Sequence, residues 1–240
     1  MRKISTILIL SAFTFSSCYY DSGKRVKGNG HITTDTRRVG AFNAVDQKGS
    51  FDVELVVGSE TEVQLEGEEN ILSEIETYVD GSTLKIRPRD NRSLRPTRSV
   101  KVIVTAPTFR EVETHGSGNI ISNTVLQYDD EFEASTHGSG DIKLEVIAPE
   151  VKARIHGSGN IDLRGQTRKL DLESRGSGDF NVVDLMAEEV EVEITGSGNA
   201  SVYASKSLNV EVRGSGDVKY RGNPTIKTDI KGSGNLRKLD

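Results

Sequence analysis

The chain has 240 residues, of which 34% are hydrophobic and 28% charged, with 24 glycines, no tryptophan and a formal net charge of −5. A chain of this length can bury one sizeable core. Its acidic residues are interspersed with Lys and Arg, which indicates a solvated surface. This charge pattern argues against a nucleic-acid-binding protein, because that class needs basic patches.

The first residues have the features of a secretory signal peptide. Arg2 and Lys3 precede an uncharged stretch over residues 4–15, which ends in the small residues Ser16 and Ser17. The stretch is too short for a transmembrane helix, which needs roughly 20 apolar residues. We predict that residues 1–17 are a lipoprotein signal peptide. Its removal takes two cations away, moves the formal charge from −5 to −7 and leaves no transmembrane segment.

Cys18 is the only cysteine of the chain, so it has no disulfide partner within it. The segment Phe15-Ser16-Ser17-Cys18 resembles a bacterial lipobox, in which the cysteine becomes the lipid-modified N-terminus. We predict lipid attachment at Cys18, a tether over residues 18–27, and an exported outer-membrane lipoprotein on the surface or the periplasmic side. The alternative is ordinary cleavage near Ser17, which leaves a free thiol.

Residues 28–112 show strand-like alternation at 51–56, 62–65, 83–86 and 100–105. We predict that they form irregular first coils or a small β domain.

Residues 69–78 predict one short helix, because Ile71, Leu72, Ile75 and Val79 recur at helical spacing. Such a helix would cap or flank a stack of repeats and protect its terminal apolar edge. Residues 90–98 predict an exposed loop, and an acidic partner is the alternative reading of the arginines there.

From residue 113 onward one corner, Gly-Ser-Gly-Asn/Asp, recurs at spacings of 22, 19, 19, 20, 18 and 18 residues. Apolar residues alternate with polar ones on both sides of each corner, and the differences in length fall opposite it. One unit cannot bury its own apolar stripe, so units must stack. We predict an all-β fold, a parallel β-helix (β-solenoid) of about 18–22-residue coils over residues 113–240. The Gly columns allow positive φ and close approach of coils, and we expect the Ser column to hydrogen-bond along the stack.

The fourth corner position alternates strictly between the amide and the acid, at Asn119, Asp141, Asn160, Asp179, Asn199, Asp217 and Asn235. We interpret this column as a structural corner ladder. The alternation separates like charges to about 10 Å, near the screening length at physiological salt, and each amide can donate to the neighbouring carboxylate. A calcium site is the alternative, but only every second coil offers an acid, so we assign no metal here.

The residue before each corner must face outward, because its neighbour faces inward. This surface stripe consists of His115, His137, His156, Arg175, Thr195, Arg213 and Lys231. We interpret it as a solvated edge column. Three stacked histidines could instead bind a transition metal or sense pH. Because no cysteine or closely spaced histidine supports them, we predict no metal and no cofactor.

Several motifs carry a family resemblance in combination with the corners, namely Gly28-Asn29-Gly30, residues 38–42, Gly49-Ser50-Phe51-Asp52-Val53, residues 69–72 and residues 105–107. Together they resemble the head GIN domain family of "putative" auto-transporter adhesins of Bacteroidetes, which are often lipoproteins. The resemblance covers residues 28–240 and implies a right-handed β-helix. It supplies no catalytic residues and no ligand.

We therefore predict a non-enzymatic cell-envelope adhesin or ligand-contact scaffold that binds the membrane through its lipid anchor. Its ligand is an unidentified protein or glycan, and an aromatic content of 5% argues against an aromatic sugar platform. One alternative is a polysaccharide-active β-helix enzyme, which needs paired carboxylates over a cleft. Another is an envelope-stress or signalling component that acts through a protein partner. Arg237, Lys238 and Asp240 either guard the edge of the last coil, or that edge pairs with another chain to form a homo-oligomer.

Overall fold

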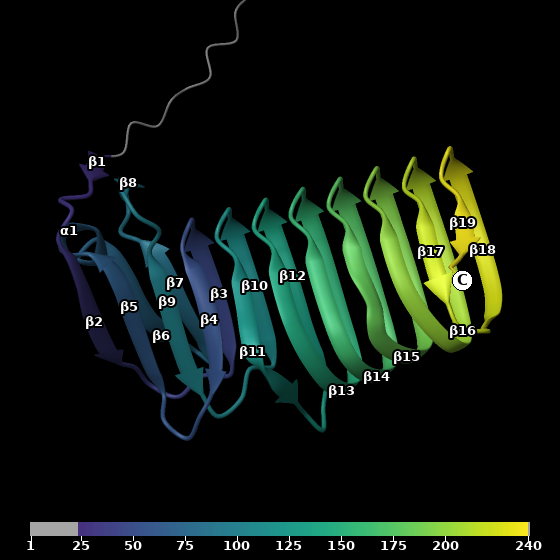
Figure 1. Ribbon diagram of the computed structural model, residues 1–240, viewed down its shortest axis with the longest axis horizontal. Coiled ribbons are helices and arrows are strands. Elements are labelled where there is room, and N and C mark those ends of the chain that lie inside the picture. Colours follow the sequence, from purple (N-terminus) through teal and green to yellow (C-terminus); the bar gives the residue numbers. More distant parts are fainter. Residues whose placement is uncertain (1–23, 240) are drawn as a thin grey trace, which may run out of the picture.

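The computed structural model describes residues 24–239. The predicted signal peptide, Cys18 and Asp240 lie outside the described residues. Between residues 24 and 239, no helix is long and apolar enough to cross a membrane. Strands dominate this part of the chain, and they stack side by side into one elongated body (Figure 1).

The first part of the body holds nine strands and a single turn of helix within the described residues (Figure 1). They are β1 Lys24–Lys27, β2 Ile32–Arg38, β3 Ala44–Gly49, β4 Asp52–Val57, β5 Glu62–Glu68, α1 Glu69–Leu72, β6 Ile75–Asp80, β7 Thr83–Pro88, β8 Arg92–Arg95 and β9 Lys101–Ala106.

The second part holds the repeats. Its strands are β10 Glu111–Gly116, β11 Ile120–Gln127, β12 Phe132–Gly138, β13 Ile142–Gly157, β14 Ile161–Gly176, β15 Phe180–Gly196, β16 Ala200–Gly214, β17 Val218–Arg221, β18 Thr225–Gly232 and β19 Leu236–Lys238. All pairings among them are parallel, and the pairing of β13 with β14 runs from Ile142 opposite Ile161 to Gly157 opposite Gly176. The predicted all-β parallel solenoid is confirmed.

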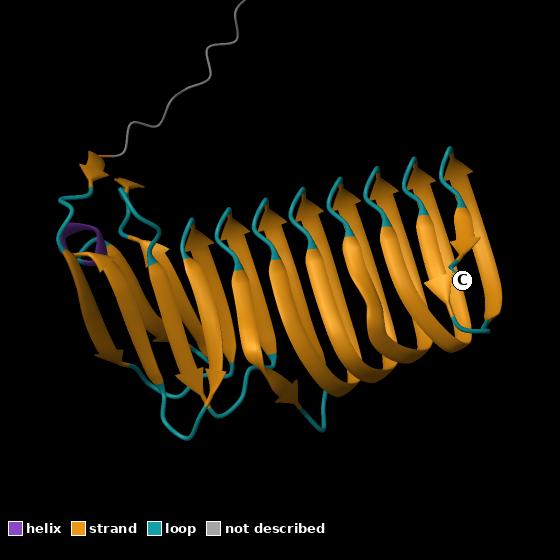
Figure 2. Cartoon of the chain, viewed as in Figure 1, coloured by secondary structure: helices purple, strands orange, loops and turns teal. Residues whose placement is uncertain are grey.

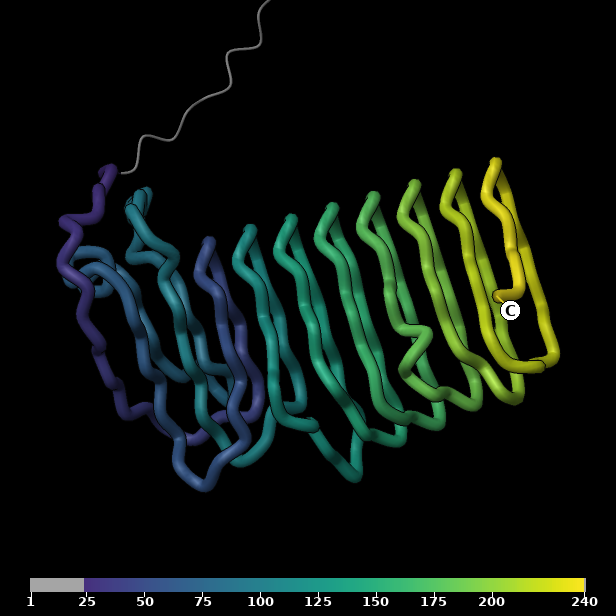
Figure 3. The backbone as a smooth tube through the Cα atoms, viewed as in Figure 1, coloured from purple at the N-terminus to yellow at the C-terminus, as the bar shows by residue number. Residues whose placement is uncertain are grey.

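The long strands β13 to β16 continue through the bend opposite the corner, where the sequence predicts a break between two strands. Differences in coil length are absorbed there as bulges, and the register of β15 against β16 shifts between Val182 and Met186. Figure 3 shows this shift as a kink in a green coil. Backbone pairing with both neighbouring coils keeps the bend extended.

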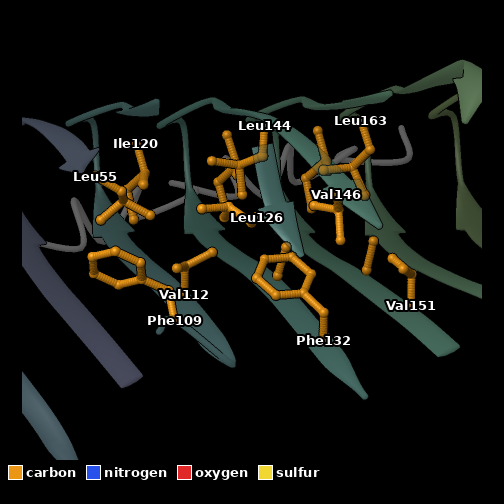
Figure 4. Close-up of a cluster of buried hydrophobic side chains, with 14 of the residues drawn as sticks. Leu55, Phe109, Val112, Ile120, Leu126, Phe132, Leu144, Val146, Val151 and Leu163 are labelled. Atoms are coloured by element: carbon orange, nitrogen blue, oxygen red, sulfur yellow. The ribbon is translucent and has the colours of Figure 1, made fainter. Parts of the chain in front are cut away.

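The core is the interior between the two walls of the coils. Apolar residues at the fourth and sixth positions after each first glycine, and at the second, fourth and sixth before it, are buried almost throughout the repeats. Figure 4 shows Leu144 and Leu163 from one wall and Phe132 and Val151 from the other facing the same interior. The inward positions are thus confirmed, and Tyr220 in the last coils is only partly buried.

The corners form the row of turns that follow the strand arrowheads along one edge of the body (Figure 2). At Gly157, φ is 139°, and a Cβ atom would collide with the carbonyl of Gly138 in the preceding coil. Gly159 has no positive φ, but a Cβ there would collide with the carbonyl of Gly140. Close stacking therefore requires glycine at both positions.

The N-terminal half continues the solenoid instead of forming a separate β domain. Strand β3 pairs in parallel with β10, which places Gly49 opposite Gly116, and β4 pairs in parallel with β11. On their other side, β7 pairs with β3 and β9 with β4. The antiparallel pairs β2–β5, β5–β9 and β6–β7 then close this end of the stack.

Three local expectations need correction. The helix is confirmed but ends at Leu72, and Ile75 to Asp80 form β6, since the alternation from Ile75 to Val79 also fits a strand paired with β7. Residues 24–27 of the predicted tether form β1, which pairs with β8 inside the predicted loop 90–98. The Ser column hydrogen-bonds along the stack through its backbone. The backbone N–H of Ser139, for example, donates to the Gly116 carbonyl of the preceding coil at 2.7 Å.

Candidate functional site

The corner column forms an unbroken ladder of hydrogen bonds. The side-chain oxygen of each member accepts the backbone N–H of the next, at 2.7 to 3.3 Å from Asp52 through Asn235. Each Asn that follows an Asp also donates its side-chain amide to that carboxylate, as Asn160 Nδ2 does to Asp141 Oδ1 at 3.0 Å. One oxygen of each member up to Asp217 and the amide of each Asn are engaged within the stack, which points to an architectural role.

Asp52 is a member of this ladder that the sequence reasoning missed. It lies 67 residues before Asn119, and both the backbone and the side-chain N–H groups of Asn119 donate to its Oδ1. The Gly49-Ser50-Phe51-Asp52 segment is a corner in which Phe51 replaces the second glycine. Comparing it with Gly-Ser-Gly-Asn/Asp would have revealed the eighth corner.

The surface stripe lies on the outer face of the wall that ends at each corner. Its cations pair with the acidic residues two positions earlier. Arg175 lies 2.6 Å from Glu173, Lys231 lies 3.0 Å from Asp229, and Arg213 contacts Glu211. The three cations of the stripe are therefore charge-compensated within their own coils.

The stripe begins differently, at His115 and His137. Their rings stack with centroids 4.7 Å apart, and Glu113 Oε1 lies 3.1 Å from Nε2 of both rings. His156 meets His137 edge-on at 4.7 Å. Burial lowers the pKa of His137, although the negative charge of Glu113 opposes this shift. The sequence predicted the stacked histidines but missed Glu113, because a neighbouring column supplies it.

A groove with a volume of about 620 Å³ crosses the outer face of the other wall, over the four successive strands β11, β13, β14 and β15. Asp162 lies between Lys143 and Asn181 in one column of its lining. Arg164 and Asp184 lie opposite each other in the next column, and Arg164 Nε is 2.9 Å from a carboxylate oxygen of Glu145. The lining thus alternates donors and acceptors.

A second hollow of about 430 Å³ lies farther along the same coils, over β13 to β16. Its lining includes Met186, which is 44% exposed, and Tyr203, together with the polar side chains of Gln166 and Arg168. Both hollows combine polar side chains with exposed apolar ones, such as Ile121 and Met186, and we treat them as the candidate contact surface. No spacing rule in the sequence predicts them, since they depend on the bulges of the coils.

The fold and its repeated corner define a parallel β-solenoid in which corner side chains join neighbouring coils. The chain belongs to the family described as "Putative auto-transporter adhesin, head GIN domain", whose model matches residues 41–224. The predicted family resemblance is confirmed.

Solved structures show the same architecture. A "putative adhesin" from Bacteroides fragilis is 25% identical, with a TM-score of 0.85, and the match covers 89% of this chain and 100% of that one. A "putative lipid binding protein" from Parabacteroides distasonis is 28% identical, with a TM-score of 0.77, over 90% of this chain and 100% of that one. No curated protein matches the chain. The family and these neighbours support an adhesin-like role at the cell surface or envelope.

Proposed function

We propose that this protein is a non-enzymatic adhesin of the cell envelope, and that it binds a polar ligand in the groove over β11, β13, β14 and β15. The observation that carries the proposal is the lining of this groove. Lys143, Asp162, Arg164, Asn181 and Asp184 offer charged and amide groups, and Ile121 and Val183 add apolar side chains that are at least partly exposed.

The chemistry of this lining favours a glycan. A polyhydroxylated ligand needs closely spaced donors and acceptors, and its carbon faces can rest on apolar side chains. Stacked strands hold these groups at about 4.8 Å intervals, which makes the surface rigid before any ligand arrives. A preorganised surface loses little entropy on binding, and this suits a contact protein.

The test is binding of the purified full chain to an array of polysaccharides and glycoproteins, together with a pull-down from envelope extracts. The expected result is saturable binding to a defined set of glycans. Empty results in both assays, with protein that melts cooperatively, would refute the adhesin proposal. Incubation with a panel of polysaccharides should release no reducing ends, and release would indicate an enzyme instead.

We also propose a cellular location at the outer membrane. A signal peptide over residues 1–17 and lipid attachment at Cys18 would hold the solenoid at the outer membrane, with β1 as its first described strand. Metabolic labelling with a lipid precursor should mark the wild-type chain and leave Cys18→Ser unmarked. Equal labelling of both chains would contradict the anchor. Protease shaving of intact cells would then distinguish the surface side from the periplasmic side.

A further inference from the structure

The start of the surface stripe has a different chemistry from the rest of it. Three later coils carry an Arg or Lys that pairs with an acid of its own coil, as Arg175 does with Glu173. His115 has Glu113 in its own coil, but His137 has Ser135 at that position. His137 is directly opposite His115 in the register and shares Glu113 with it. One carboxylate thus serves two imidazoles.

The three side chains converge on one small volume. Glu113 Oε1 is 3.1 Å from Nε2 of His115 and of His137, and the three ligand atoms all lie within 4.8 Å of one another. Around a tetrahedral ion with bonds of about 2.0–2.2 Å, ligand atoms lie roughly 3.4 Å apart. Both imidazole-to-carboxylate distances are close to that value.

A second observation points to a cation at the same place. Asp46 is only 4% exposed, and its Oδ1, which lies 3.8 Å from His115 Nε2, has no hydrogen-bond partner among the described residues. Its other oxygen accepts from Lys85 Nζ at 2.6 Å, and this hydrogen bond raises the pKa of Lys85. Lys85 satisfies one oxygen of Asp46, and a further positive charge beside His115 would satisfy the other, which is buried without a donor.

We propose that Glu113, His115 and His137 bind a divalent transition-metal ion of the zinc class, with Asp46 supplying a buried negative charge behind His115. Two imidazoles and one carboxylate favour zinc, cobalt, nickel or copper over calcium or magnesium, which prefer all-oxygen sites. Three protein ligands leave the fourth tetrahedral position open toward solvent.

The local environment suits this ion. Imidazole binds a metal ion in its neutral form, so metal binding should weaken as the pH falls. The side chains of His115 and His137 are each 33% exposed, so their rings can rotate from the stacked arrangement to direct both Nε2 atoms at one ion. The site needs two adjacent coils, because β10 supplies Glu113 and His115 while β12 supplies His137.

The test uses the untagged full chain, freed of metal with a chelator, and titrates it with Zn²⁺ by calorimetry and with Co²⁺ by visible absorption. The expected result is one ion per chain, with the intense visible bands of tetrahedral Co²⁺. Glu113→Gln, His115→Gln and His137→Gln should each weaken zinc binding at least tenfold. His156→Gln is the matched control, because it changes the same column one coil later and should retain the affinity.

Thermal melting separates loss of the site from loss of the fold. Each metal-free variant should melt close to the metal-free wild type, and zinc should raise the melting temperature of the wild type and of His156→Gln only. Absence of a saturable one-to-one site would overturn the proposal. Undiminished zinc binding by His137→Gln, or equal loss in His156→Gln, would do so as well.

Discussion

The corner ladder predicts a large, pH-dependent cost for one isosteric change, Asn160→Asp. In the native chain Asn160 Nδ2 donates to Asp141 Oδ1 at 3.0 Å, and Asn160 Oδ1 accepts the backbone N–H of Asp179 at 3.0 Å. The variant retains the acceptor but loses the donor. It also places a third carboxylate between two others, about 4.8 Å from each along the stack.

The magnitude follows from Coulomb's law and from the protonation limit. Two unit charges about 4.8 Å apart repel by about 1 kcal/mol in water and by about 3.5 kcal/mol at an effective dielectric constant of 20. The new carboxyl can also bind a proton, so its charge cannot cost more than about 4 kcal/mol at pH 7. With two partly solvated neighbours we expect Asn160→Asp to lose about 3 kcal/mol, which is roughly 6–12 °C in melting temperature for a chain of this size.

The stability loss of Asn160→Asp should increase with pH. Repulsion raises the folded-state pKa of the new carboxyl above its unfolded value of about 3.9, so the folded state binds more protons and stability falls as the pH rises through that window. The deficit should be nearly absent at about pH 3.5 and complete at pH 7. Melting curves of variant and wild type across this range measure it.

Asp141→Asn is the matched control. It removes a charge but keeps an oxygen that can accept the N–H of Asn160, so we expect a change below about 1 kcal/mol with little dependence on pH. The reasoning is refuted if Asn160→Asp melts like the wild type at pH 7, or if its deficit is unchanged at pH 3.5.

Three further changes test separate parts of the structure. Gly159→Ala drives a Cβ atom into the preceding coil and should cost about 1–3 kcal/mol or more in denaturant unfolding, whereas Gly40→Ala, which meets nothing within 4 Å, should be near neutral; equal effects would contradict close stacking. The hydrogen bond from Thr97 lowers the pKa of the Glu68 carboxyl in the folded state. The stabilisation of the fold by the ionised carboxylate is therefore present above the unfolded pKa of about 4.3 and is lost as the pH falls. The melting temperature of Glu68→Gln should accordingly vary less with acid than that of the wild type, and parallel curves would argue against this role. Burial raises the pKa of Tyr128 to about 12, so an ultraviolet titration should show a late ionisation phase near that pH, and loss of this phase in Tyr128→Phe would assign it.

The repeats could be predicted from the sequence in detail because their period is fixed. A constant corner places every apolar residue in register, so the inward faces of β13 to β16 followed directly from counting. The predicted end of α1 was wrong because Ile75 and Val79 fit the spacing of a helix and the alternation of a strand equally well. Pairing of β6 with β7 decides between them, and that pairing is tertiary.

The surfaces were harder to predict than the core. The sequence identified the column of His115 and His137, but Glu113 belongs to the adjacent column. Asp46 lies on β3, which pairs directly with β10 although β4 to β9 separate the two strands in the sequence. The groove depends on bulges that shift the register, such as the one between Asp162 and Arg164. These features arise from contacts between stacked coils, and the sequence pattern of a single coil does not predict such contacts.

The most direct test of the adhesin account is a pair of charge exchanges read out as glycan-array binding. Glu145→Arg with Arg164→Glu reverses an ion pair at the groove, and Glu173→Arg with Arg175→Glu reverses one on the opposite wall. Both double variants keep the net charge and an ion pair, so both should fold. The account predicts that the first loses at least tenfold in affinity for the glycans that the wild type binds, while the second binds like the wild type. Equal affinities for all three chains would contradict the groove as the binding surface.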